Sequence, residues 1–287
     1  MDKLKNHYQL YINGEWKAGS EGQIMQSLNP HNNQSWASFD CADKKDIDTA
    51  VKGARKALND PSWRPVTATD RGKLLYKLAD LIEENAENIG KIETQDSGKL
   101  LAETVSQTKY VSDYYRYFAG LADKIEGSTL PIDKKDMHVY TTHQPIGVVA
   151  AIVPWNAQMF LTATKLAPAI AAGCSVIIKA SEISPCAMFE LAKLIEKAGF
   201  PKGVVSVITG DANNCSIPLT SHPDIDRIAF TGGTETAKEI IKNSSNNFAA
   251  TNLELGGKSP LIVFEDADIE SAANGIIAGN FGASGQS

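Results

Sequence analysis

The sequence has few cysteines, no long apolar run and no excess of basic residues. Its four cysteines, Cys41, Cys174, Cys186 and Cys215, form no CxxC pair and no metal-ligand spacing, which predicts a reduced, cytoplasmic protein without a metal site. No apolar run reaches the roughly 20 residues that a membrane helix needs, and residues 1–14 lack the apolar core of a secretory signal. A net charge of −6 with dispersed basic residues argues against a nucleic-acid partner.

The middle of the chain contains a strand–helix–strand pattern. Residues 147–153 form a continuous apolar run, which predicts a strand buried on both faces, and Pro154 ends it because proline has no N–H for a ladder. A helix is expected over 161–172 and a second buried strand over 174–178. Such a βαβ unit is expected to be right-handed, with parallel strands.

The same alternation of strands and helices continues toward the C-terminus. Further strands are expected over residues 204–208, 225–230, 248–253 and 261–264. Alternating elements predict an α/β fold with an open, doubly wound, mainly parallel Rossmann-like sheet. The 287 residues, 43% of them hydrophobic, are enough for a large core.

The first third of the chain is expected to be mainly helical. A hairpin turning at Asn13-Gly14 opens it, and apolar residues at helical spacing predict helices over 43–58, 70–92 and 101–121. The Asp43 side chain is expected to cap the first of these. This region shows no cluster of catalytic side chains, which favours a scaffold packed on the later sheet.

Residues 137–143 alternate in the way of a half-exposed strand before the chain turns at Gln144-Pro145. This segment is either an ordinary edge hairpin or a surface that pairs with another subunit, because exposed strand edges invite pairing. The sequence leaves both interpretations open.

Polar side chains follow two of the expected strands, where α/β sheets bind their ligands. The Asn156 amide could donate to a developing oxyanion or cap the next helix. Lys179 and Glu182 could bond ribose hydroxyls, with the carboxylate repelling a 2′-phosphate, or could form a solvated pair on a loop.

Two later motifs are ambiguous in the same way. Gly232 and Gly233 follow a strand and precede a helix, an arrangement that lets backbone approach a pyrophosphate, although the pattern is not GxGxxG. Glu254 could be a general base in a partly apolar pocket or a carboxylate bonded to nearby backbone amides. The five histidines show neither metal nor triad spacing and are expected on the surface.

Four motifs stand in one order along the chain: PWN (154–156), KASE (179–182), FTGGT (230–234) and ELGGK (254–258). Together they resemble the NAD(P)-dependent aldehyde dehydrogenase superfamily. The similarity covers the whole chain, including the YINGEW opening and the SGQ ending. Ala180 and Gly233 depart from the family pattern, which often has proline and serine at these positions.

The resemblance implies a role for each motif. Asn156 would be the side-chain half of the oxyanion hole, Glu254 the base that activates the deacylating water, and Lys165 a lysine near the reacting centre. Lys179 and Glu182 would clamp the adenine ribose, which favours NAD over NADP. The remaining expected cofactor contacts are Ile152, Trp155, Gly210, Thr231, Gly232, Gly233 and Leu255.

The catalytic cysteine of the family is missing from the 287 residues. In the family, glycine and glutamine are followed by one variable residue and then the nucleophile. Gly285, Gln286 and Ser287 occupy the first three of these positions, so the cysteine is expected directly after Ser287. The chain is therefore expected to be an N-terminal fragment that oxidises no aldehyde by itself.

The resemblance implies an oxidoreductase that converts a small aldehyde to a carboxylate with NAD⁺, through a cysteine thiohemiacetal and thioester. Its dinucleotide-binding domain would comprise residues 1–131 and 154–264, with an oligomerisation arm at 132–153 and a catalytic domain beginning at 265–287. The full-length protein would be a homodimer or homotetramer. Three alternatives remain: a non-catalytic dinucleotide-binding fragment, a decoy subunit, and a coenzyme-A-acylating aldehyde dehydrogenase.

Overall fold

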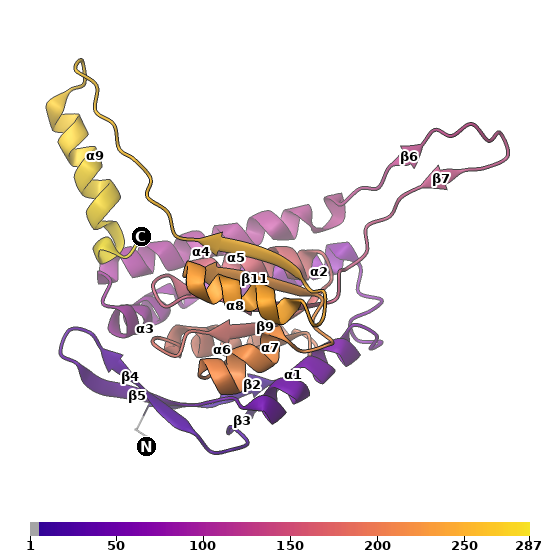
Figure 1. Ribbon diagram of the computed structural model, residues 1–287, viewed down its shortest axis with the longest axis horizontal. Coiled ribbons are helices and arrows are strands. Elements are labelled where there is room, and N and C mark those ends of the chain that lie inside the picture. Colours follow the sequence, from indigo (N-terminus) through magenta and orange to yellow (C-terminus); the bar gives the residue numbers. More distant parts are fainter. Residues whose placement is uncertain (1–5) are drawn as a thin grey trace.

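The structure is a computed structural model that describes residues 6–287 (Figure 1). Within these residues the central sheet has seven strands in the order β12–β11–β8–β9–β10–β2–β3. The strands from β12 to β10 run parallel, and β2 and β3 form an antiparallel hairpin at one edge. The prediction of an open, mainly parallel α/β sheet is confirmed. The strands are β2 (Leu10–Ile12), β3 (Glu15–Lys17), β8 (Val148–Ile152), β9 (Ser175–Ala180), β10 (Val205–Thr209), β11 (Arg227–Gly232) and β12 (Ala250–Leu255).

Helices cover both faces of this sheet. On one face α5 and α6 link β8, β9 and β10, and α2, α3 and α4 pack over them; α1, α7 and α8 pack together on the other face. The N-terminal helices are therefore a scaffold on the sheet, as expected. The helices are α1 (Lys44–Ala57), α2 (Ala68–Glu84), α3 (Ala86–Ser97), α4 (Leu101–Leu121), α5 (Gln158–Ala171), α6 (Cys186–Ala198), α7 (Ile217–Thr220) and α8 (Thr234–Ser244).

The strand order reverses at β8. The chain runs from β8 to β9 and β10 in one direction, then returns to place β11 and β12 on the other side of β8. The connections that follow β8 and β11 therefore diverge to opposite faces of the sheet. In open α/β sheets this reversal creates the crevice in which ligands bind, at the carboxyl ends of the strands.

Local sequence explains several element boundaries. Asn13 and Gly14 both have positive φ, 55° and 78°, and join β2 to β3 in the predicted tight turn. Asp43 caps α1 with a reciprocal capping box involving Asp46. The helix expected from residue 70 begins earlier, at Ala68, because the Thr67 side chain accepts the hydrogen bond of its first turn.

The structure adds a second sheet that the sequence analysis did not predict. It contains three strands within the described residues, in the order β1–β5–β4. These are β1 (His7–Tyr8), β4 (Ile24–Asn29) and β5 (Gln34–Asp40). The sheet packs near α3, which contacts β4.

A thin hairpin projects from the body of the molecule (Figure 1). It contains only two short strands, β6 (Thr129–Leu130) and β7 (Val139–Tyr140), preceded by the short helix η1 (Ala122–Lys124). The strand expected over 137–143 is thus reduced to two residues, because no core lies beneath it. Residues 148–152 of the expected arm at 132–153 form β8 instead, which is buried at the centre of the sheet.

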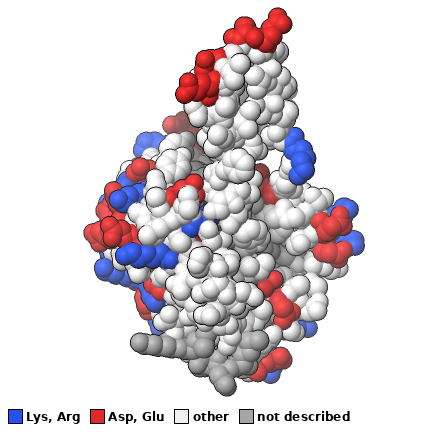
Figure 2. Space-filling view, turned by 90° about the vertical axis from the view of Figure 1, so that its left-hand side faces the viewer, with Lys and Arg blue, Asp and Glu red and all other residues white. Residues whose placement is uncertain are grey.

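The chain leaves the sheet after β12. The strand expected over 261–264 is wrong: these residues are exposed and pair with no other strand in the described chain. Asp268 caps α9 (Ile269–Phe281), of which no residue is buried. The helix forms a projection of largely uncharged surface, with acidic side chains toward its far end (Figure 2). No helix in residues 6–287 is both long and apolar enough to cross a membrane.

Candidate active site

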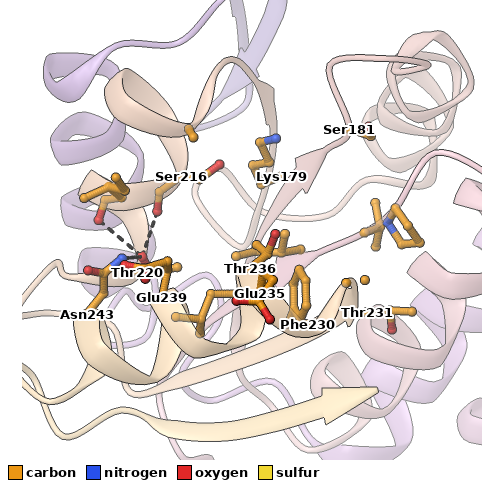
Figure 3. Close-up of a pocket in the computed structure, with 18 of the residues that line it drawn as sticks. Lys179, Ser181, Ser216, Thr220, Phe230, Thr231, Glu235, Thr236, Glu239 and Asn243 are labelled. Carbon is orange, nitrogen blue, oxygen red and sulfur yellow. Dashed lines mark hydrogen bonds between the residues drawn. The ribbon is translucent and has the colours of Figure 1, made fainter. Parts of the chain in front are cut away.

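A cleft of about 490 Å³ opens at the carboxyl ends of β8, β9 and β11 (Figure 3). Six residues that the sequence analysis selected line it: Ile152, Lys179, Glu182, Thr231, Gly232 and Gly233. Polar residues of α7, α8 and the preceding turn η2 (Ala212–Ser216) complete the wall, among them Ser216, Thr220, Glu235, Thr236, Glu239 and Asn243. No sequence motif identified this second group, because polar residues on these helices follow the pattern of any solvent-exposed helix face.

Lys179 and Glu182 form an ion pair on one side of the cleft. The Lys179 Nζ lies 2.6 Å from the Glu182 Oε2, and Lys179 is 5% exposed within β9. The pair is therefore not a solvated pair on a loop, as one interpretation held. A buried lysine held by a half-exposed carboxylate presents both a donor and acceptors to a ligand in the cleft.

The N-terminus of α8 lies on the other side. Its N-cap is Gly233, so no side chain caps the helix, and a Cβ added to Gly233 would meet no atom within 4 Å. Thr231 and Gly232 end β11 just before it. An uncapped helix N-terminus with open space before it favours an anionic group, because its first N–H groups lack intrahelical partners.

Asn156 follows β8 and contacts the far end of the chain. Its Nδ2 donates a hydrogen bond of 2.5 Å to the carbonyl oxygen of Gln286. Ala157 is the N-cap of α5 and no side chain caps that helix, so the capping interpretation of Asn156 is wrong. Gln286 is anchored in turn, since its Nε2 donates to the Ser97 carbonyl at 2.8 Å.

Lys165 lies on α5 beneath the end of β11. Its Nζ donates to the Thr231 Oγ1 at 2.6 Å and to the Leu161 carbonyl at 3.3 Å. Desolvation lowers the pKa of Lys165 to about 8, partly opposed by the negative charge of Glu254. A lysine that loses its proton near neutral pH can hold or transfer one at this position.

Glu254 pairs with Thr231 across the β11–β12 ladder, which brings it near Lys165. It is exposed, so residues 6–287 do not form the apolar pocket expected around it. None of the hydrogen bonds within these residues joins it to a backbone amide, which was the other interpretation. The side chains of Trp155 and Leu255 are likewise exposed, with relative accessibilities of 39% and 42%.

Gly210 does not line the cleft. It adopts φ +156°, and an added Cβ would lie 2.9 Å from the Cys215 Cβ and 3.0 Å from the Ala42 carbonyl oxygen. The close approach of these two segments, rather than contact with the cleft, requires glycine at this position.

The four cysteines are unpaired and buried. Burial raises the pKa of Cys41 and Cys215 to about 12 and also raises the pKa of Cys174 and Cys186. Because the thiolate is the reactive form, none of them is an activated nucleophile. No group of metal-ligating side chains occurs within the described part of the chain.

The expectation of surface histidines is wrong for His7 and His222, whose side chains are 13% and 11% exposed. His7 lies between Ser38 and Asp40, with Nδ1 at 2.8 Å from the Ser38 Oγ and Nε2 at 3.0 Å from the Asp40 Oδ2. The arrangement resembles a hydrolase triad, but Ser38 is fully buried and cannot reach a substrate. The contacts of His7 with Ser38 and Asp40 instead hold β1 against β5.

The fold and the cleft define an α/β protein with a Rossmann-like sheet and an anion-favouring crevice. Comparison with known proteins gives the family. The model of the aldehyde dehydrogenase family matches residues 16–287, and the chain belongs to that family.

Two relatives and one solved structure illustrate the similarity. The chain is 54% identical to (Z)-2-((N-methylformamido)methylene)-5-hydroxybutyrolactone dehydrogenase of Acinetobacter baylyi, over 98% of this chain and 57% of that protein. It is 42% identical to "Aldehyde dehydrogenase, cytosolic 1" of Macroscelides proboscideus, over 98% and 56%. The NAD⁺ complex of an aldehyde dehydrogenase from Bacillus cereus superposes with a TM-score of 0.96 at 40% identity, over 99% and 58%. The chain thus spans about half the length of these relatives.

Proposed function

We propose that the protein to which this chain belongs oxidises an aldehyde to a carboxylate with NAD⁺, and that this chain supplies the cofactor site. The observation that carries the proposal is the cleft in which the Lys179–Glu182 pair faces the uncapped N-terminus of α8. One side suits ribose hydroxyls and the other suits a pyrophosphate. The family and the NAD⁺ complex of the Bacillus cereus relative support the same assignment.

The residues of the cleft fit a dinucleotide. Gly233 leaves open space before the helix, where a larger residue would project toward the phosphates. Thr231 and Gly232 precede it and Ile152 lines the cleft. Trp155 and Leu255 are exposed outside its lining, and we propose that they contact the cofactor near its nicotinamide. The Glu182 carboxylate would repel a 2′-phosphate, which favours NAD⁺ over NADP⁺.

NAD⁺ supplies the hydride acceptor when bound; the chain's own residues supply positioning and proton transfer. The Asn156 amide, fixed by Gln286, donates to the substrate oxygen as it becomes an oxyanion. Glu254 activates the water that releases the carboxylate, and Lys165 holds a proton nearby. The attacking thiolate belongs to a cysteine expected after Ser287, so the 287 residues alone are expected to turn over no aldehyde.

The assembly and location belong to the same proposal. The projecting β6–β7 hairpin would pair with another copy to give a homodimer or homotetramer, because short exposed strands offer free backbone groups. Residues outside the arm up to 264 would form the dinucleotide-binding domain, and the segment from 265 the start of the catalytic domain. Four unpaired cysteines favour the cytoplasm.

Titration of the chain with NAD⁺ and NADP⁺ tests the cofactor assignment. We expect NAD⁺ to bind more tightly, and Glu182→Gln to change the ratio of the two dissociation constants by about tenfold toward NADP⁺, which corresponds to roughly 1.4 kcal/mol. Glu190→Gln is a matched control, since Glu190 pairs with Lys193 on α6 and does not line the cleft. Failure of the wild-type chain to bind either nucleotide would reject the proposal.

A further inference from the structure

A second polar pocket lies at the amino end of β8, opposite the cleft at the carboxyl ends of the strands. Its volume is about 360 Å³, and its wall includes Gly147, where the chain enters β8, and Gly173, just after α5. Three arginines line it: Arg55 from α1, Arg64 from the α1–α2 connection and Arg71 from α2. The sequence contains only five arginines, so more than half of them gather at one pocket. We call this site the arginine pocket.

Two of the three guanidinium groups are held in place. The Arg55 Nη2 contacts the Asp226 Oδ2 at 2.6 Å and donates to the Asp224 carbonyl at 2.7 Å. Arg71 donates from Nε to the Ala171 carbonyl at 3.1 Å and from Nη1 to the Val66 carbonyl at 2.9 Å. These bonds fix the two groups before any ligand arrives, which lowers the entropic cost of binding.

Donors remain unused in the arginine pocket. The Arg55 Nε is buried and has no hydrogen-bond partner within residues 6–287. Arg64 is exposed, and its guanidinium has no ion pair and no hydrogen bond within the described residues. Asn59 and Gln144 add amide groups to the wall. An unpaired buried N–H costs free energy, which an acceptor entering the pocket would recover.

The charge in the arginine pocket is not balanced by its own wall. No aspartate or glutamate is among the residues that line it. Asp226 neutralises Arg55 only, while Arg71 contacts carbonyl oxygens. Desolvation lowers the pKa of Arg71, because burial disfavours its positive charge. A bound anion would offset that cost.

We propose that the arginine pocket binds an oxyanion, namely phosphate or the phosphate group of a small molecule. Planar guanidinium groups match the geometry of phosphate oxygens and bind them in pairs. The site would tie α1 and α2 to residues 144–147, the segment that joins the β6–β7 hairpin to β8. This ligand would be distinct from the dinucleotide in the cleft.

Thermal unfolding in inorganic phosphate, with chloride at matched ionic strength as the reference, tests the proposal. Saturating NAD⁺ is present throughout, so that phosphate does not compete for the α8 N-terminus. We expect phosphate to raise the unfolding midpoint of the wild-type chain, and Arg64→Gln to weaken the apparent phosphate affinity by about tenfold. Arg64 is exposed, so this variant should fold. Arg116→Gln, an arginine outside the pocket, should retain the wild-type response.

A parallel titration with ribose 5-phosphate separates the two sources of the anion. Tighter binding than inorganic phosphate, lost in Arg64→Gln, would indicate a phosphorylated small molecule; equal or weaker binding would indicate phosphate itself. An equal response of wild type and Arg64→Gln, or no response beyond that to chloride, would overturn the proposal. Arg55 and Arg71 would then serve only to hold neighbouring segments together, through Asp226 and backbone carbonyls. The difference between wild type and Arg64→Gln reports on the arginine pocket even if NAD⁺ does not fill the cleft, because Arg64 does not line the cleft.

Discussion

Two helices of equal length, α6 and α9, have very different surroundings. Both contain 13 residues and many apolar side chains. In α6 nine residues are buried between the sheet and the N-terminal helices, whereas α9 has none. The difference teaches that an apolar sequence does not determine burial unless a partner surface reaches it.

The same contrast separates the whole parallel sheet from the segment after β12. Every residue of β8, β9 and β10 is buried. In contrast, Phe264, Ile277 and Phe281 are 73%, 55% and 69% exposed. Exposed apolar surface of this kind marks an interaction site or a tendency to aggregate, so we expect the chain to have poor solubility. The cleft lies at the carboxyl ends of the buried parallel strands and gains its rigidity from them.

A matched pair of isoleucine substitutions gives the largest expected effect of this contrast. Ile177 in β9 is fully buried, and Ile277 in α9 is 55% exposed. Ile177→Ala should lower the free energy of unfolding by about 3 kcal/mol, since it leaves a cavity, while Ile277→Ala should change it by less than about 0.5 kcal/mol. Urea denaturation measures both. A comparable loss in the two variants would show that α9 packs on the body in solution.

Two aspartate N-caps, one at the start of the packed helix α1 and one at the start of the exposed helix α9, test the same contrast with a smaller expected effect. Asp43 accepts from the backbone amides of Lys45 and Asp46 at the start of α1, and Asp268 accepts from the amide of Ser271 at the start of α9. Asp43→Ala should reduce global stability by about 1 kcal/mol. Asp268→Ala should leave the global transition unchanged and speed amide exchange in α9 alone.

Hydrogen exchange read by mass spectrometry, together with urea denaturation, distinguishes the two outcomes. Unchanged exchange in α9 after Asp268→Ala would mean that the cap does not maintain this helix. A shift of the global transition by Asp268→Ala would mean that α9 unfolds together with the sheet.

The sequence predicted the elements that a short stretch of residues specifies. The continuous apolar run before Pro154 became β8, and Asn13-Gly14 formed the expected turn, because each depends on local chemistry. The cleft was partly predictable for the same reason, since KASE and FTGGT each include the carboxyl end of a strand, where the crevice lies.

Features that depend on distant contacts were not predictable. The run at 261–264 is as apolar as β8 but has no strand to pair with in the described residues, so its pattern gave the wrong element. The contact of Asn156 with Gln286 joins residues 130 positions apart. The three arginines of the arginine pocket come from two helices and a connection, and no sequence spacing predicts that they lie together.

The smallest expected effect concerns the pKa values of two lysines, one buried at the site and one on the surface. Burial lowers the pKa of Lys165 to about 8, while the Glu239 carboxylate raises the pKa of the exposed Lys242. Between about pH 8 and 10.5 the folded chain therefore binds fewer protons at Lys165 than the unfolded chain does. The contribution of Lys165 to stability should rise with pH over this interval, and the cost of burying its charge is greatest below pH 8.

Acetylation with dilute acetic anhydride, followed by peptide mass spectrometry across a pH series, measures both lysines in one experiment, because only the neutral amine reacts. The reactivity of Lys165 should reach half its maximum near pH 8, and that of Lys242 above pH 10.5. Thr231→Val removes the oxygen that accepts from Lys165, a bond that favours the charged form, and should move the Lys165 midpoint lower still. A Lys165 midpoint near that of Lys242 would mean that water reaches the amine freely, and that the contrast between the buried region and the surface does not extend to this site.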